Sequence, residues 1–172
     1  MAHNLKSFIE DVLISEIKII QQTHGHHYLS FSLISQGIEF LGACLDDKEL
    51  NAPSQSSKRF ERAIKDLFPN KYRAFNNQGT PFNLYKNLRC GLLHICIPKN
   101  KIELTQRAEG KNEYKHLTKS KVREEGEERL ILVSEDLFYD FEKACRKVIA
   151  KYENNELNGN KIPDTLLETD LK

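Results

Sequence analysis

Residues 28–45, YLSFSLISQGIEFLGACL, decide the fold class of this chain. Apolar side chains recur there at three- and four-residue steps, which predicts a helix, and they cover much of its circumference. A helix of that kind is stable in water only when neighbouring elements surround it. The stretch therefore predicts the central helix of a helical bundle, and the rest of the chain has to supply the surrounding helices.

Other segments with helical spacing can surround this centre, namely residues 5–22, 56–68, 82–96 and 134–154. Pro98 prevents the third of these from continuing. The last begins with Ser-Glu-Asp, a hydroxyl cap followed by two acids at the positive end of the helix dipole. Together with the central helix, these segments predict a mainly α bundle of about five helices.

The stretch between residues 101 and 133 follows a different pattern. Residues 101–106 and 129–133 alternate or carry β-branched side chains, and residues 113–118 can form a third strand. Glycines in the charged segments between them suit hairpin turns. We therefore expect a small antiparallel sheet, inserted before the last helix.

The chain is predicted to form one domain over residues 1–154, with the β insertion at about 101–133 and a polar, flexible tail at 155–172. Its 172 residues suit a single domain. The composition, with 39% hydrophobic and 30% charged residues, excludes the disordered and fibrous classes.

Composition also bears on the compartment and on cofactors. No uninterrupted apolar run approaches the roughly 18 residues of a membrane span, and the first residues do not resemble a signal peptide. The four cysteines form no C-x-x-C pair, which favours reduced thiols in a cytoplasm. His24, His26 and His27 share one turn but lack further ligands nearby, so solvent-exposed loop histidines are favoured over a metal site. We expect a cytoplasmic protein with no membrane partner, no metal and no cofactor.

Charge is unevenly distributed, although the net charge is only +1. No acidic residue occurs from Leu67 through Ile102. Such a basic block can attract phosphates, or it can form solvated helix faces and loops, and both interpretations stay open. Lys71 and Arg73 alternate with aromatic residues and could hold single-stranded nucleic acid, while the aromatic rings could equally anchor the loop on the core.

Two residues inside this block have the chemistry to cleave RNA. His94 can accept or donate a proton near neutral pH. Arg89 can hold a phosphate through two hydrogen bonds and offset the charge that develops on it. The attacking group can be the ribose 2′-hydroxyl, so this chemistry requires no metal ion.

An ideal helix turns by about 140° over five residues, so the side chains of Arg89 and His94 do not share one face. Gly91 between them allows close approach of another backbone, and a symmetric dimer would bring two such pairs together.

The stretch LYKNLRCGLLH, residues 84–94, resembles the signature helix of HEPN domains (the higher-eukaryote and prokaryote nucleotide-binding superfamily). The resemblance implies a helical bundle that pairs as a homodimer and acts on RNA. Many such proteins are metal-independent endoribonucleases of toxin–antitoxin, abortive-infection and CRISPR systems. It further implies Arg89 and His94 as catalytic residues, with Lys86 and Asn87 in support as nucleic-acid-binding residues, and a cognate antitoxin or nucleotidyltransferase as a partner.

One departure from the family pattern opens an alternative. Active HEPN ribonucleases usually carry a polar residue, often asparagine, directly after the arginine, where this chain has Cys90. A thiol is a poor hydrogen-bonding substitute, and the chain could instead be a non-catalytic dimeric module that binds a protein or nucleic acid. A purely structural interpretation is also open: Arg89 would pair with a carboxylate such as Glu39, and a half-buried His94 would bond to a backbone carbonyl.

Overall fold

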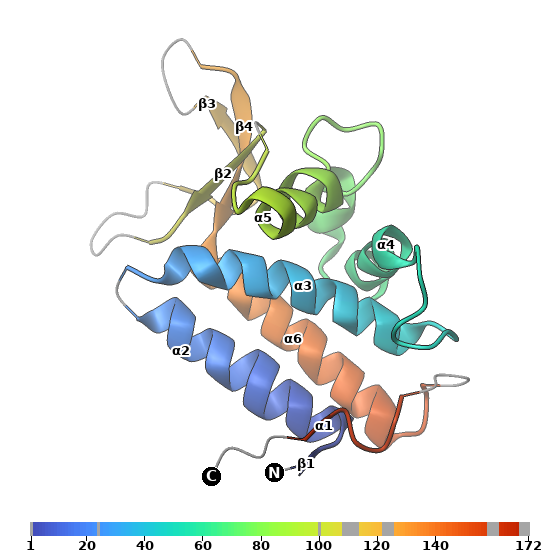
Figure 1. Ribbon diagram of the computed structural model, residues 1–172. Coiled ribbons are helices and arrows are strands. Elements are labelled where there is room, and N and C mark those ends of the chain that lie inside the picture. Colours follow the sequence, from blue (N-terminus) through green and yellow to red (C-terminus); the bar gives the residue numbers. More distant parts are fainter. Residues whose placement is uncertain are drawn as a thin grey trace.

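The computed structural model of the chain describes residues 2–23, 25–99, 101–107, 114–121, 126–157 and 162–168. Its helical elements, in chain order, are α1 (Leu5–Ser7), a π-helical segment (Phe8–Glu16), α2 (Ile17–Gln22), α3 (His27–Leu45), α4 (Ser56–Asp66), a 3-10 helix (Asn70–Phe75), a π-helical turn (Tyr85–Arg89), α5 (Cys90–Ile95) and α6 (Ser134–Glu153). The first three run on without a break, as do the π-helical turn and α5. The predicted mainly α fold, with a small sheet before the last long helix, is confirmed (Figure 1).

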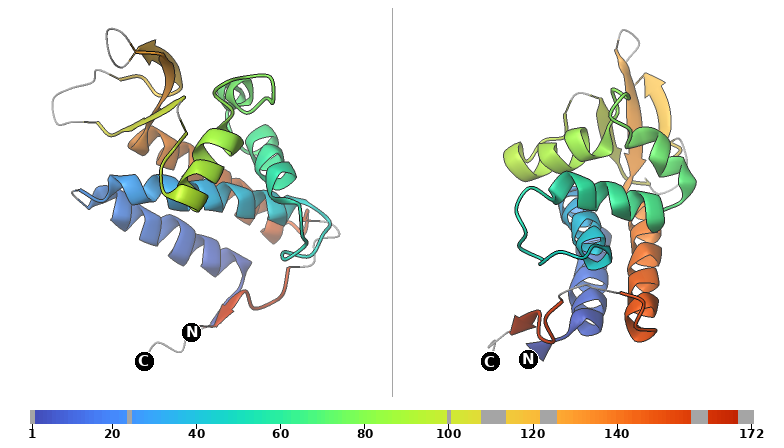
Figure 2. Two further views of the ribbon diagram at one scale, coloured as in Figure 1. Left: turned by 45° about the horizontal axis from the view of Figure 1, so that its top comes forward. Right: turned by 90° about the vertical axis from the view of Figure 1, so that its right-hand side faces the viewer.

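Helix α3 is the centre of the bundle, as its apolar circumference predicted. It packs against α2, α4 and α6. The continuous helix that ends with α2 lies side by side with α3 and α6 (Figures 1 and 2). Gly42 permits the close contact with α4, because a Cβ atom there would lie 1.8 Å from the carbonyl oxygen of Arg59. The crossing of α3 and α4 therefore depends on the absence of a side chain at this position.

The 19 residues of α3 are also long and apolar enough to cross a membrane, by length and composition alone. In the structure, however, 56% of the relevant stretch is buried inside the protein. The core helix of a bundle passes the same test, and the packing on α2, α4 and α6 is that of a core helix.

The small sheet differs from the prediction in two ways. Strands β2 (Ile102–Thr105), β4 (Glu128–Val133) and β3 (Thr118–Lys121) lie in that order, so β4 is central. β3 pairs antiparallel with β4, but β2 pairs parallel, with Ile102 opposite Leu130. The sheet is therefore mixed, and the third strand begins where the prediction ended it. Residue alternation reports which face of a strand is buried and not the direction of its partner, which explains the error. Parts of the predicted insertion, residues 108–113 and 122–125, lie outside the described residues.

The C-terminal segment, predicted as a flexible tail, returns to the N-terminus. Strand β5 (Leu167–Glu168) pairs antiparallel with β1 (Ala2–His3). Leu157, Ile162 and Leu166 pack against the hydrophobic core. The paired strands β1 and β5 therefore lie at one end of the bundle (Figure 1).

Candidate functional site

The motif helix, formed by the π-helical turn and α5, is held in place by contacts at both ends. It ends at Cys96, whose left-handed backbone (φ 56°) turns the chain, and whose carbonyl accepts a hydrogen bond of 2.6 Å from the Tyr28 hydroxyl on α3. The chain then passes back over Gly91, where a Cβ atom would lie 2.6 Å from the carbonyl oxygen of Ile97. The Lys99 N–H donates to the Asn87 carbonyl over 2.9 Å. The prediction that Gly91 allows close approach of another backbone is confirmed.

Arg89 points from the motif helix toward α3. Its Nη2 lies 2.7 Å from Oε2 of Glu39, and only 11% of the side chain is exposed. The guanidinium lies over the Tyr85 ring, 5.7 Å from its centroid. The pairing with Glu39 that the structural interpretation predicted is therefore present. The contact is imperfect, because Arg89 Nε and Glu39 Oε2 are both buried without a hydrogen-bond partner among the described residues.

His94 differs from the structural interpretation. The residue is exposed, and its imidazole makes no hydrogen bond within the described part of the chain, whereas a half-buried ring bonded to a carbonyl was expected. It lies in the last turn of α5, between the exposed side chains of Leu93 and Ile95. His94 is therefore accessible for proton transfer, while Arg89 is largely covered.

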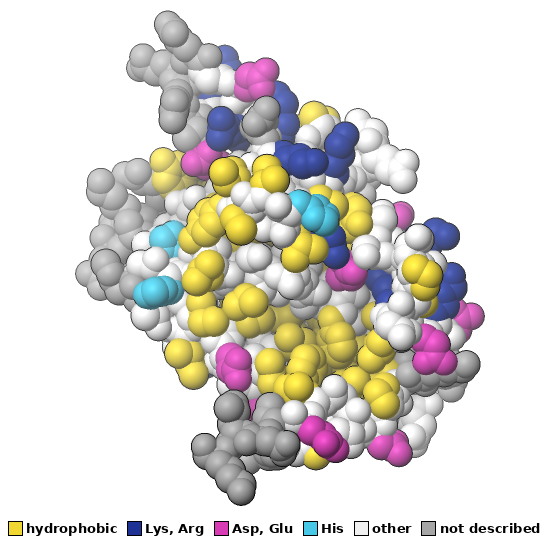
Figure 3. Space-filling model, in the orientation of Figure 1, with side chains coloured by type: hydrophobic (Ala, Val, Ile, Leu, Met, Phe, Trp, Pro, Cys, Tyr) yellow, Lys and Arg dark blue, Asp and Glu magenta, His cyan; other side chains and the backbone are white. Residues whose placement is uncertain are grey.

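The surface around His94 is unusually apolar. Hydrophobic side chains gather on the face that carries α2, α3 and α5 (Figure 3). Those exposed by more than a third include Ile19, Leu29, Leu33, Leu93, Ile95 and Ile97. A gathering of exposed apolar side chains of this kind is typical of a protein–protein interface.

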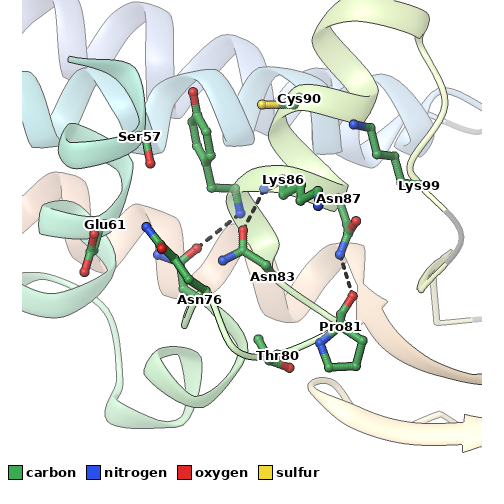
Figure 4. A pocket seen from close by; sticks show the side chains of 12 residues that line it. Ser57, Glu61, Asn76, Thr80, Pro81, Asn83, Lys86, Asn87, Cys90 and Lys99 are labelled. Carbon is green, nitrogen blue, oxygen red and sulfur yellow. Dashed lines mark hydrogen bonds between the residues drawn. The ribbon is translucent and has the colours of Figure 1, made fainter. Parts of the chain in front are cut away.

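Lys86 and Asn87, two of the predicted nucleic-acid-binding residues, line a cavity of about 470 Å³ beside the motif helix (Figure 4). Cys90 lines the same cavity, whereas Arg89 and His94 do not. The Asn87 side chain is buried, and its Nδ2 donates to the Pro81 carbonyl over 2.7 Å, so it also has a structural role.

Sequence reasoning missed several residues of this cavity, among them Ser57, Asn76, Gln78, Asn83 and Lys99. Two of the amides shape it: Asn76 Oδ1 accepts the Tyr85 N–H and Asn83 Oδ1 accepts the Lys86 N–H, over 3.1 and 2.8 Å. The signal in the sequence was the amide-rich loop NNQGT at residues 76–80.

The other two predicted nucleic-acid-binding residues differ in their surroundings. Lys71 Nζ pairs with Asp140 Oδ2 over 3.2 Å, and Lys71 does not line the cavity beside the motif helix. Arg73 donates to the carbonyl of Lys65 and lines a second cavity, which adjoins the first. The structure thus groups Arg73 with Lys86 and Asn87, and separates Lys71 from them.

A buried polar cluster links the 3-10 helix, the sheet and α6. The Tyr72 hydroxyl donates to Asp140 Oδ2 (2.9 Å) and lies 2.7 Å from His116 Nε2. His116 Nδ1 accepts the Val133 N–H over 3.0 Å, which places the ring proton on Nε2. Burial lowers the pKa of His116 to about 4, and Lys71 acts in the same direction. This cluster was not predicted, because its members are far apart in the sequence.

The histidine turn and the cysteines offer no metal site in the described residues. No group of three His, Cys, Asp or Glu side chains there could hold a metal ion. His26 is exposed, and His24 lies outside the described residues. No disulfide joins any of the four cysteines.

No protein-family model, no curated protein and no solved structure matches this chain. Its function therefore has to be argued from the site itself.

Proposed function

We propose that this protein is a HEPN-like RNA-acting protein that cleaves RNA without a metal ion, as a homodimer joined through the apolar face around α5. The observation that carries the proposal is the presence of two suitable side chains on one helix. His94 is exposed, and the buried Nε–H of Arg89 has no partner among the described residues. A buried donor without a partner is costly, and a bound phosphate oxygen would satisfy it.

The proposed chemistry uses the RNA's own nucleophile. Neutral His94 of one protomer removes the proton from a ribose 2′-hydroxyl, and the resulting oxygen attacks the adjacent phosphorus. Arg89 offsets the negative charge on the phosphate oxygens in the transition state. His94 of the second protomer, in its protonated form, gives a proton to the departing 5′-oxygen. The products are a 2′,3′-cyclic phosphate and a free 5′-hydroxyl, and the proton taken from the 2′-hydroxyl is balanced by the proton given to the 5′-oxygen.

Dimerisation follows from the same surface. The exposed side chains Leu93 and Ile95 flank His94 in the sequence, so a second copy that covers them also comes close to the histidine. A symmetric pair presents the same patch from both chains. The apolar face therefore brings two histidines into one cleft.

A second candidate function, a non-catalytic dimeric module that binds a protein or nucleic acid, is favoured by a specific observation. Glu39 lies 2.7 Å from Arg89 and offsets the positive charge that a phosphate would need. Cys90 follows the arginine and supplies no strong hydrogen bond. In such a module the helix and the dimer remain, but turnover is lost.

An RNA-cleavage assay in EDTA separates the two candidates. It compares the wild type with Arg89→Ala, His94→Ala and the control His26→Ala, which removes an exposed histidine outside the motif helix. We expect cleavage by the wild type and the control, and a loss of at least about 100-fold in the two motif variants, the usual contribution of one acid–base group. Equal cleavage by His94→Ala would contradict the proposal. RNA left intact by all four folded proteins would favour the binding module.

A further inference from the structure

Three cavities on one side of the molecule adjoin one another. The first, beside the motif helix, shares Glu61, Asn76 and Gln78 with a second of about 480 Å³. The second shares Lys65 and Arg73 with a third of about 510 Å³. The three cavities are therefore neighbours along α4 and the loop before the motif helix, and we refer to them together as the trough. Figure 4 shows its first part, between α4 and the motif helix.

The trough is predominantly cationic. Its basic lining residues are Arg62, Lys65, Arg73, Lys86, Lys99 and Lys151, and its acidic ones are Glu61, Asp66 and Glu156. Glu156 is already paired with Lys151 over 3.3 Å. By contrast, Lys65, Lys86 and Lys99 pair with no carboxylate in the part of the chain that the structure describes. These ammonium groups are available to phosphates, and their spread along the trough suits a chain of phosphates better than a single anion.

The first cavity adds groups that can recognise a base. Its volume of about 470 Å³ lies in the range of small-ligand sites and accommodates one nucleotide. Asn76 and Asn83 are held in fixed orientations by their bonds to the motif helix backbone. Gln78 and Ser57 make no side-chain hydrogen bond among the described residues and can meet the polar edge of an unpaired base.

Tyr85 connects the trough to the proposed catalytic residues. Its ring lines the first cavity and also contacts the Arg89 guanidinium, 5.7 Å from the ring centroid. Burial and the neighbouring Cys90 raise the pKa of Tyr85, so the phenol stays neutral beside a phosphate. A strand that leaves the first cavity past Tyr85 therefore arrives next to Arg89.

We infer that this trough binds single-stranded RNA, with phosphates along Lys65, Lys86 and Lys99 and one unpaired base in the first cavity. The inference rests on the proposed function for its biological purpose. It deepens that function, because it names the form of the RNA and the path by which the RNA reaches Arg89. Binding can nevertheless be measured where no cleavage occurs. Duplex RNA does not fit this description, because its bases are paired and its groove edges are read differently.

The test measures the affinity of His94→Ala protein for a labelled 12-nucleotide single-stranded RNA by fluorescence anisotropy. In that background we compare Lys65→Glu/Lys86→Glu with Lys121→Glu/Lys143→Glu, which changes the net charge equally at exposed lysines outside the trough. We expect the trough variant to bind roughly tenfold more weakly or worse. For this variant, the slope of the logarithm of the binding constant against the logarithm of the salt concentration should be shallower by about 1.4. This is the value for two lost phosphate contacts on a single strand. The control should change affinity less than about twofold.

Equal binding by the trough variant and the control, with both folded, would overturn the inference. Tighter binding of a 12-base-pair duplex, or of DNA with the same sequence, would overturn the assignment to single-stranded RNA. Failure of the proposed function gives a different pattern: no cleavage by the wild type, but RNA binding that depends on Lys65 and Lys86.

Discussion

At the scale of single residues, the proposed chemistry depends on how Arg89 is held. Glu39 positions the guanidinium against α3, while Arg89 Nε stays buried without a partner in the described residues. Breaking a buried ion pair leaves an uncompensated charge, which usually costs several kcal/mol. The Glu39 carboxylate is about one-fifth exposed, so solvent reduces that cost.

Replacement of Glu39 tests both roles of this pair. We expect Glu39→Gln to lower the free energy of unfolding by about 1–2 kcal/mol and to tighten RNA binding, because the competing carboxylate is removed. Chemical denaturation and anisotropy measure the two effects. Glu153→Gln is the matched control, since its partner Lys6 forms an exposed pair, and exposed pairs contribute little to stability. Unchanged RNA affinity in Glu39→Gln would show that the pair does not compete with phosphate.

At the scale of elements, the sequence predicted most helices well. The helices at residues 5–22, 28–45 and 134–154 have strong apolar spacing, and the structure places them within a residue or two of those bounds. The buried face of the central helix was harder to predict. Leu29 and Leu33 belong to its apolar circumference but are exposed, because a helix that is apolar all round does not indicate which face meets its neighbours.

Pairings between segments that are distant in the chain could not be predicted from the sequence. The parallel pairing of β2 with β4 and the return of β5 to β1 join segments distant in the chain. For the site, the Arg89–Glu39 contact was named as an alternative because Glu39 is the lone acid of the central helix. The amide-lined cavity depends instead on the three-dimensional packing of α4, a loop and the motif helix. A single sequence does not show such convergence.

The cluster that links the 3-10 helix, the sheet and α6 predicts a pH dependence of stability. The pKa of His116 is about 4 in the folded protein and about 6.5 when unfolded. The unfolded chain therefore binds the proton first, and stability falls as the pH drops from about 6.5 to about 4. Between pH 7 and pH 5 we expect a loss of up to about 2 kcal/mol from this group.

Urea denaturation of the wild type and His116→Gln at pH 7 and pH 5 measures this contribution. The variant should be less stable than the wild type at pH 7, because it disturbs the bonds to Tyr72 and Val133. It should nevertheless lose less stability on acidification, since it lacks the titrating ring. The same acid sensitivity in both proteins would contradict the assignment to His116.

At the scale of the whole molecule, the apolar face predicts the oligomeric state. Ile95 and Ile97 are about three-fifths exposed beside His94, an arrangement that a partner chain would cover. We expect the wild type to sediment as a dimer and Ile95→Glu/Ile97→Glu to sediment as a folded monomer with reduced RNA cleavage. Tyr139→Glu, which alters an exposed aromatic side chain on α6, should leave the dimer intact. A wild type that is monomeric at micromolar concentrations would contradict the prediction.

Cleavage of RNA by its own 2′-hydroxyl, with His94 and Arg89 as the catalytic residues, is tested most directly by the chemical ends of the products. A labelled single-stranded RNA is incubated with the wild type in EDTA, and the fragments are identified by mass spectrometry. We expect 2′,3′-cyclic phosphate and 5′-hydroxyl ends, and no cleavage where the 2′-hydroxyl is methylated. Fragments with 5′-phosphate ends, or cleavage at methylated positions, would contradict the proposed chemistry.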